Sequence, residues 1–121
     1  MSVHGQELPW ALADLLSRRF RALADPTRLK LLAELQEQEL TVQELTEALR
    51  TSQQNTSKHL AVLNQAGFVR RRKLGVYAHY SVSDPSTFDI LALMQASLAG
   101  EMALARRALE AASGPIAEGR G

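Results

Sequence analysis

Residues 52–67 read SQQNTSKHLAVLNQAG, a segment bounded at both ends by residues typical of helix termini. Ser52 is a preferred N-cap because its hydroxyl can accept a hydrogen bond from a free backbone N–H of the first turn. Gly67 tolerates the left-handed backbone conformation that follows many helices. Leu60, Leu63 and Ala66 recur at helical spacing. The pattern predicts a helix whose C-terminal half faces a hydrophobic core.

The N-terminal half of this predicted helix carries almost only hydrogen-bonding side chains. Gln and Asn present paired donors and acceptors that match adenine edges, and Ser, Thr and Lys suit phosphates and other base edges. We therefore predict a DNA-recognition helix. Its candidate contacts are Gln53, Gln54, Asn55, Ser57, Lys58 and His59. Taken alone, the segment also fits a capped amphipathic helix with a polar first turn.

A second short helix is predicted directly upstream. Thr41 and Glu44 form the Ser/Thr-x-x-Glu pattern of a capping box, and an apolar stripe follows over residues 42–49. Only a tight connection separates this helix from the next one. Two short helices joined in this way predict a helix-turn-helix over residues 41–66.

A β-hairpin is predicted immediately after the recognition helix. Two runs rich in β-forming residues lie within residues 68–82 and flank Gly75, which supplies the turn. A hairpin in this position is a wing. Arg71, Arg72 and Lys73 are predicted to contact the DNA backbone. Strand alternation places Arg71 and Lys73 on one face, with Arg72 on the other face or at the turn edge.

The charge of the chain is unevenly distributed. The net charge is only +1, yet the segment from Ala48 to Ser83 contains six Lys and Arg residues and no Asp or Glu. The remainder holds all thirteen acidic residues and eight basic ones. A basic segment of this kind is typical of contact with a polyanion such as double-stranded DNA. A helical protein-interaction module without DNA specificity would leave it unexplained.

The first and last helices are predicted to form a dimer surface. They are expected over residues 9–23 and 84–112, and the second is long enough to leave apolar side chains that a 121-residue monomer cannot cover. We therefore predict a homodimer; the alternative is that the last helix folds back on its own core. The whole chain, 1–121, is predicted to be a single winged helix-turn-helix domain, mainly α with a small β-hairpin wing, and residues 113–121 a flexible tail.

Several other classes of protein do not fit the composition. The absence of cysteine excludes disulfides and thiolate metal sites. His4, His59 and His79 are too scattered to predict a metal site, and no cofactor is expected. No convergent catalytic set is present, so we predict no enzyme. With neither an uninterrupted apolar run of 18 residues nor a secretory signal pattern, we expect no membrane contact and a cytoplasmic protein.

The chain resembles the ArsR/SmtB family of small bacterial winged helix-turn-helix repressors. The resemblance rests on the runs FRALADPTRLKLL (20–32), SKHLAVL (57–63) and AGFV (66–69), and on the wing at 75–80. It extends over residues 12–83 in motif and over 84–112 in helix placement only. It implies a homodimer that is held by its first and last helices and binds an inverted-repeat operator near a promoter. Binding of a signal would weaken the DNA complex.

The chain also departs from the family pattern. Arsenic-type sensors carry cysteines at the start of the helix that here begins at Thr41, and zinc-type sensors carry Asp and His pairs along the last helix, which here has no histidine. Val76 occupies a wing-tip position where many relatives carry arginine. We therefore expect a regulator that does not sense metals. A small organic ligand, a partner protein and no signal at all remain open, as does a MarR-like regulator responding to a small organic ligand.

Overall fold

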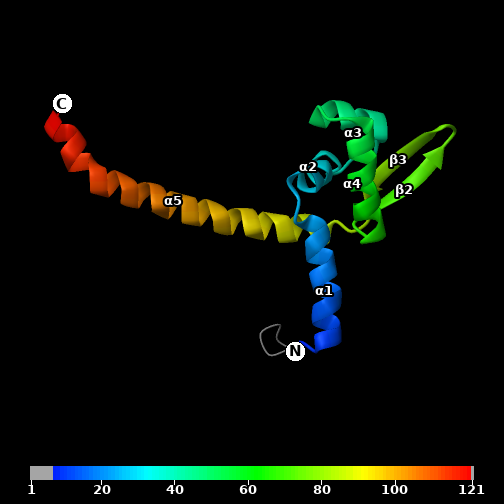
Figure 1. Ribbon diagram of the computed structural model, residues 1–121, viewed down its shortest axis with the longest axis horizontal. Helices are drawn as coiled ribbons and strands as arrows, with labels where there is room; N and C mark the ends of the chain where they lie inside the picture. Colours follow the sequence, from blue (N-terminus) through cyan, green and yellow to red (C-terminus); the bar gives the residue numbers. More distant parts are fainter. Residues whose placement is uncertain (1–6, 121) are drawn as a thin grey trace. The chain divides into compact units, whose positions relative to one another are not determined.

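The computed structural model describes residues 7–120, with side chains described over residues 7–112. The elements follow in the order α1 (Trp10–Leu23), α2 (Pro26–Glu34), β1 (Leu40–Thr41), α3 (Val42–Leu49), α4 (Gln53–Gln65), β2 (Val69–Leu74), β3 (Tyr77–Val82) and α5 (Ser86–Arg120). The chain divides after Asp84 into two compact units, which are described separately below. The first contains a helix-turn-helix followed by a hairpin, so the predicted winged helix-turn-helix is the fold of the protein (Figure 1).

Side-chain caps fix the starts of three helices, as predicted. Asp25, Thr41 and Ser52 accept hydrogen bonds from backbone N–H groups of α2, α3 and α4, at 3.1, 3.1 and 3.0 Å. At α3 the carboxylate of Glu44 also accepts from the Thr41 backbone N–H at 2.9 Å, which completes the capping box. These bonds satisfy backbone donors that have no partner within their helix.

The turn between α3 and α4 is locked by backbone conformation and by two hydroxyls. Arg50 ends α3 with φ of 53°, a left-handed conformation that redirects the chain within two residues. The hydroxyl oxygens of Thr46 on α3 and Thr56 on α4 lie 2.9 Å apart, and Thr56 donates to the Ser52 carbonyl. Because Thr56 is fully buried, this contact holds the two helices together from inside.

The hydrophobic core lies between α2, α3, α4 and the base of the sheet. Its fully buried side chains are Leu31, Leu32, Leu35, Leu45, Leu60, Leu63 and Val69. Two of them, Leu60 and Leu63, are the α4 positions that the sequence assigns to the core. After α4 the chain turns at Gly67, whose φ of 88° is the left-handed value expected there.

The sheet has one strand more than predicted. β2 and β3 form the expected antiparallel hairpin, closed at Leu74 and Tyr77 around Gly75, whose φ is 64°. β1 pairs with the other edge of β3, which gives the order β1-β3-β2. β1 was not predicted because a strand of two residues shows no alternation of apolar and polar side chains.

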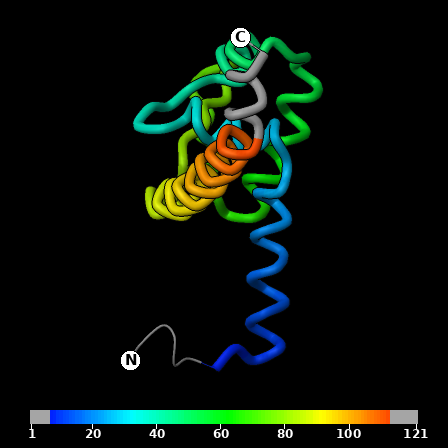
Figure 2. The backbone as a smooth tube through the Cα atoms, turned by 90° about the vertical axis from the view of Figure 1, so that its left-hand side faces the viewer, coloured from blue at the N-terminus to red at the C-terminus, as the bar shows by residue number. Residues whose placement is uncertain are grey.

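Helix α1 projects away from the other helices of its unit, as both views show (Figure 1 and Figure 2). Within it only Ala22 and Leu23 are buried. Its apolar side chains nearer the N-terminus are exposed, with Trp10 90% and Phe20 54% accessible. In the described unit this face of α1 therefore packs on nothing.

Helix α5 forms the second unit and exposes a long apolar surface. Large exposed residues on it include Leu93, Met94, Leu98, Met102, Leu104 and Leu109. By length and composition alone, Ser86–Ala112 could cross a membrane, which the sequence analysis did not expect; a helix that packs on a partner in water can have the same composition. Its assigned bounds pass the predicted end at residue 112, and the predicted flexible tail, 113–121, lies outside the residues whose side chains are described.

Candidate nucleic-acid interface

The N-terminal half of α4 presents a row of exposed polar side chains. Gln54, Ser57 and Lys58 are exposed, and Ser57 and Lys58 lie three and four residues after Gln54, which places all three on one side of the helix. Gln54, Asn55 and Lys58, together with the N-cap Ser52, line a shallow depression of about 290 Å³. The structure thus brings together amide, hydroxyl and ammonium groups at the start of the predicted recognition helix.

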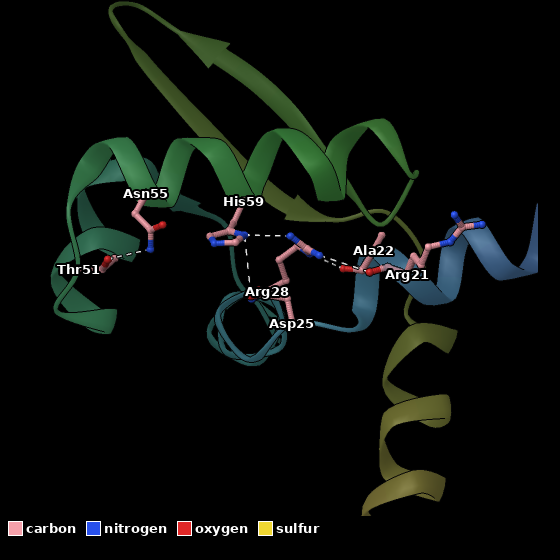
Figure 3. Close-up of polar contacts among 7 residues, drawn as sticks. All are labelled: Arg21, Ala22, Asp25, Arg28, Thr51, Asn55 and His59. Carbon is pink, nitrogen blue, oxygen red and sulfur yellow. Dashed lines mark hydrogen bonds and ion pairs between the residues drawn. The ribbon is translucent and has the colours of Figure 1, made fainter.

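Asn55 belongs only partly to this surface. Its side chain is half-buried, and its Nδ2 donates to the Thr51 hydroxyl at 3.0 Å (Figure 3). The amide is therefore held against the turn between α3 and α4. This contact supports the start of the recognition helix and restricts the freedom of Asn55 to meet a base.

His59 lies on the inward side of α4. Its side chain is only 9% exposed and points toward Arg28 and Asp25 on the α2 side (Figure 3). Thr56 is also buried. Thr56 and His59 lie four residues before Leu60 and Leu63, respectively, so all four side chains are on the buried face of the helix. The predicted direct contact of His59 with DNA does not fit this burial, because a base or phosphate cannot reach the ring.

Arg28 connects His59 to the end of α1. Its Nε donates to the Ala22 carbonyl at 2.6 Å, and one terminal nitrogen donates to the Arg21 carbonyl at 3.3 Å (Figure 3). The other terminal nitrogen lies 3.0 Å from Nδ1 of His59. A guanidinium cannot accept, so Nδ1 accepts and the imidazole proton is on Nε2. Arg28 therefore holds α1, α2 and α4 in one hydrogen-bonded arrangement.

Asp25, the cap of α2, belongs to the same cluster. The hydrogen bond from the backbone N–H of Arg28 lowers the pKa of Asp25 below its ordinary value of 3.8, and the positive charge of the Arg28 guanidinium acts in the same direction. Partial burial of the carboxyl group opposes the shift. Its oxygen is 3.9 Å from Nδ1 of His59, which already accepts from Arg28.

The wing distributes its basic residues unequally. Arg71 and Lys73 are exposed and lie opposite Tyr80 and Ala78, so they share one face of the hairpin. Arg72 is on the other face, where it donates two hydrogen bonds to the carboxylate of Glu39 at 2.6 and 3.2 Å. This ion pair joins the wing to the segment before β1. The guanidinium of Arg72, which was predicted to contact DNA, is thus already bonded to a carboxylate within the protein.

A second depression, about 280 Å³ in volume, lies between the helix-turn-helix and the wing. It is lined by Thr41, Val42, Gln43, Gln53, Val76, Tyr77 and Ala78. Gln53 thus lies apart from the Gln54 row and faces the exposed wing turn. Gln43, also exposed, was missed by the sequence analysis; its position in the first turn of the preceding helix is the only sequence signal for it.

The described side chains include no metal-binding cluster. Over residues 7–112 no group of three or more His, Cys, Asp or Glu side chains is placed to hold a metal ion. His59 is bonded to Arg28, and His79 lies on β3 opposite Arg72. His4 lies outside the described residues.

Known proteins share this arrangement of sequence and fold. Residues 25–71 match the model of the bacterial regulatory proteins of the arsR family. The chain is also 44% identical over 87 residues to the "Probable mercury resistance operon repressor" of Streptomyces lividans, covering 72% of this chain and 70% of that protein. The chain belongs to the ArsR family. Members of this family regulate transcription and are not enzymes, and membership excludes the MarR-like alternative.

Other ArsR-like proteins extend the comparison. The transcriptional repressor SmtB homolog of Synechocystis is 38% identical over 78 residues, which is 64% of this chain and 59% of that protein. The homodimeric winged helix-turn-helix DNA-binding domain solved from Mycobacterium bovis is 25% identical, with a TM-score of 0.70 over 84% of this chain and 94% of that one. This ArsR-family chain is therefore a transcriptional regulator with a winged helix-turn-helix fold.

The ionisation of Asp25 should appear in the pH dependence of stability. Because its pKa is lowered on folding, Asp25 stabilises the fold above about pH 3.8 and loses this contribution as the pH falls through the lowered value. Asp25→Asn keeps a capping oxygen but cannot titrate. Urea unfolding at fixed protein concentration should show the wild-type advantage over Asp25→Asn shrinking between about pH 5 and pH 2. A constant difference across this range would contradict the assignment.

Proposed function

We propose that the protein is a homodimeric repressor that reads an inverted-repeat operator with the N-terminal half of α4. The observation that carries this proposal is the exposed row of Gln54, Ser57 and Lys58 on a helix that begins a winged helix-turn-helix. Gln can donate to and accept from an adenine edge, and Lys can donate to guanine or phosphate. The same helix buries Leu60 and Leu63, so reading and folding use opposite faces.

Arg71 and Lys73 on the wing would contact phosphates. Both are exposed on one face of the hairpin, and phosphate contacts fix the register of a protein on DNA without carrying sequence information. Val76, 84% exposed at the turn, offers no charge for insertion into the minor groove. Arg72 is engaged by Glu39, so we assign it a structural contact with the segment before β1. Gln53 and Gln43, which line the depression between helix and wing, would contact the DNA backbone there.

The homodimer is supported by the exposed apolar faces of two helices. Trp10 and Phe20 on α1, and Leu98 and Met102 on α5, are each more than half exposed. Contiguous apolar surface of this extent usually marks an interface. The related Mycobacterium bovis domain is homodimeric. A dimer partner also accounts for the apolar character of α5 without a membrane, and we propose that the protein acts in the cytoplasm.

We further propose that metal ions do not control this protein. Two relatives are named as repressors of a mercury resistance operon and an arsenical resistance operon. Soft metal ions favour thiolate ligands. This chain has no cysteine, and its described residues hold no cluster of alternative ligands. Another class of effector would then release the operator, or the protein would act without one.

Two substitutions should separate base reading from phosphate binding. Gln54→Ala should cost about 1–3 kcal/mol on the operator alone and relax preference at one base pair. Arg71→Ala should weaken binding to all sequences alike and reduce the slope of the salt dependence by about one unit. Fluorescence anisotropy against operator and scrambled DNA at several salt concentrations measures both. Equal losses for Gln54→Ala on both DNAs would show that α4 does not read bases.

The oligomeric state tests the apolar surface of α5. Sedimentation at micromolar concentration should give about twice the chain mass of 13.3 kDa. Met102→Glu places a charge on that surface and should weaken dimerisation by about 100-fold or more. Ser97→Glu adds the same charge at an exposed position about 140° around the helix from Met102; it is the matched control and should remain dimeric. A monomeric wild-type protein would overturn the homodimer and its paired half-sites.

Metal titration tests the proposed insensitivity. One equivalent of zinc, cadmium, mercuric ion or arsenite should change operator affinity by less than about twofold, because a closed ligand set of several donors is needed for tight binding. The same anisotropy assay measures this. A tenfold loss of affinity with any of the four would contradict the proposal.

A further inference from the structure

A basic hollow lies where the end of α1 meets α2 and the C-terminal half of α4. Its volume is about 350 Å³, and Arg18, Arg21 and Arg28 line it together with Gln65. Among the described residues that line the hollow there is no Asp or Glu. Three arginines thus line one open hollow, and all three belong to the part of the sequence that carries the acidic excess.

The guanidinium groups are held in place with donors to spare. Arg28 directs three of its five N–H groups at the Ala22 carbonyl, the Arg21 carbonyl and His59. Arg21 donates to the Ser17 hydroxyl at 3.0 Å. Arg18 pairs with Asp14 at 2.8 Å, but both side chains are more than half exposed, so the pair contributes little and can be exchanged for another anion.

The hollow is at the opposite end of α4 from the DNA-reading row. Eleven residues separate Gln54 from Gln65, which places them about 16 Å apart along the helix at ~1.5 Å per residue. The DNA surface of α4 therefore does not account for these arginines. Their remaining donors are free to pair with a different anion.

The other residues that line the hollow indicate the chemical nature of such an anion. Ala22, Val62 and Ala66 supply an apolar surface beside the guanidinium groups. Arginine binds carboxylates through paired, charge-assisted hydrogen bonds, and ligand cavities of this size take small organic molecules. We propose that this hollow binds a small organic carboxylate with an apolar body, and that Arg28 transmits its binding to α4.

The transmission would act through a contact already present. The guanidinium of Arg28 lines the hollow and also donates to Nδ1 of His59 at 3.0 Å. A bound anion would compete with His59 for the hydrogen bonds of the Arg28 guanidinium. A shift of His59 would affect its neighbour Lys58, which belongs to the proposed DNA-reading row. A ligand shifts an equilibrium only by its differential affinity for two states, and the position of Arg28 supplies that difference. This step rests on the proposed operator binding.

Ligand binding can be tested on the full chain without DNA. In an NMR titration, benzoate should shift the backbone amide signals of Ala22, Gln65 and Ala66. The isosteric neutral benzamide should leave these signals unchanged. Arg21→Gln should weaken benzoate binding by about tenfold through the lost charged hydrogen bonds. Arg18→Gln should also weaken it. Lys30→Gln removes the same charge from an exposed site on α2 outside the hollow and should change affinity by less than twofold.

The outcomes of the titration distinguish an organic carboxylate from other ligands of the hollow. Equal binding of benzamide would overturn the anion site, and inorganic phosphate binding as tightly as benzoate would overturn the organic carboxylate. Unchanged benzoate affinity in both arginine variants would overturn the placement of the site. Unchanged spectra with millimolar benzoate would overturn the proposal.

The operator assay tests the transmission. With a tenfold coupling, benzoate at about ten times its wild-type Kd should lower operator affinity about fivefold in wild type and less than twofold in Arg21→Gln, which it only half-saturates; no effect in wild type would overturn the transmission. A loss of operator affinity for ligand-free Arg21→Gln as large as that for Arg71→Ala would show that the hollow holds DNA phosphate instead. If no operator is bound at all, the proposed function fails, and the benzoate titration still decides whether the hollow is a binding site.

Discussion

The guanidinium of Arg28 is the contact on which the arrangement of α1, α2 and α4 depends. The last carbonyls of a helix lack the usual partner within it. Arg28 donates to the Ala22 carbonyl and adds a second donor to the Arg21 carbonyl, which also accepts from the Ala24 backbone N–H. The same group reaches His59 on α4. Because α1 buries only Ala22 and Leu23, hydrophobic packing constrains its direction weakly. The planar fork of arginine fixes that direction better than a flexible lysine could.

A second cation supports the same junction. The guanidinium of Arg19 lies over the ring of Phe68, 5.6 Å from its centroid, directly after α4. Phe68 is buried apart from this contact, so the stack covers an edge of the core. The Asp-Pro-Thr-Arg run of residues 25–28 combines three structural roles. Asp25 caps α2, Pro26 begins it, and Arg28 bonds α2 to α1 and α4.

The elements that local chemistry specifies could be predicted from sequence, and those that depend on distant partners could not. Caps at Asp25, Thr41 and Ser52 involve residues three positions apart, so the helix starts were predictable. The inward orientation of His59 could have been predicted, because it lies four residues before Leu63. Its polar side chain led instead to the prediction that it contacts DNA. Burial of a polar group is tolerated here because Arg28 satisfies it.

Contacts between distant segments left no local signal. Arg72 and Glu39 are 33 residues apart, and the run of four basic residues gave no sign that one of them is neutralised. β1 is too short to show a period. The hollow combines Arg18 and Arg21 from α1 with Arg28 from α2, and only the packing of α4 against both helices brings them together.

The inward orientation of Thr56 and His59 limits how much sequence one recognition helix can specify. With those two positions committed to the interior, the exposed row on the N-terminal half of α4 is short, and a few side chains specify about three base pairs. Two half-sites would then select roughly one sequence in 4,000, whereas a genome offers about 10⁶ or more competing sites. The missing discrimination, roughly 250-fold, has to come from half-site spacing and from the sequence-dependent stiffness of the DNA between the half-sites.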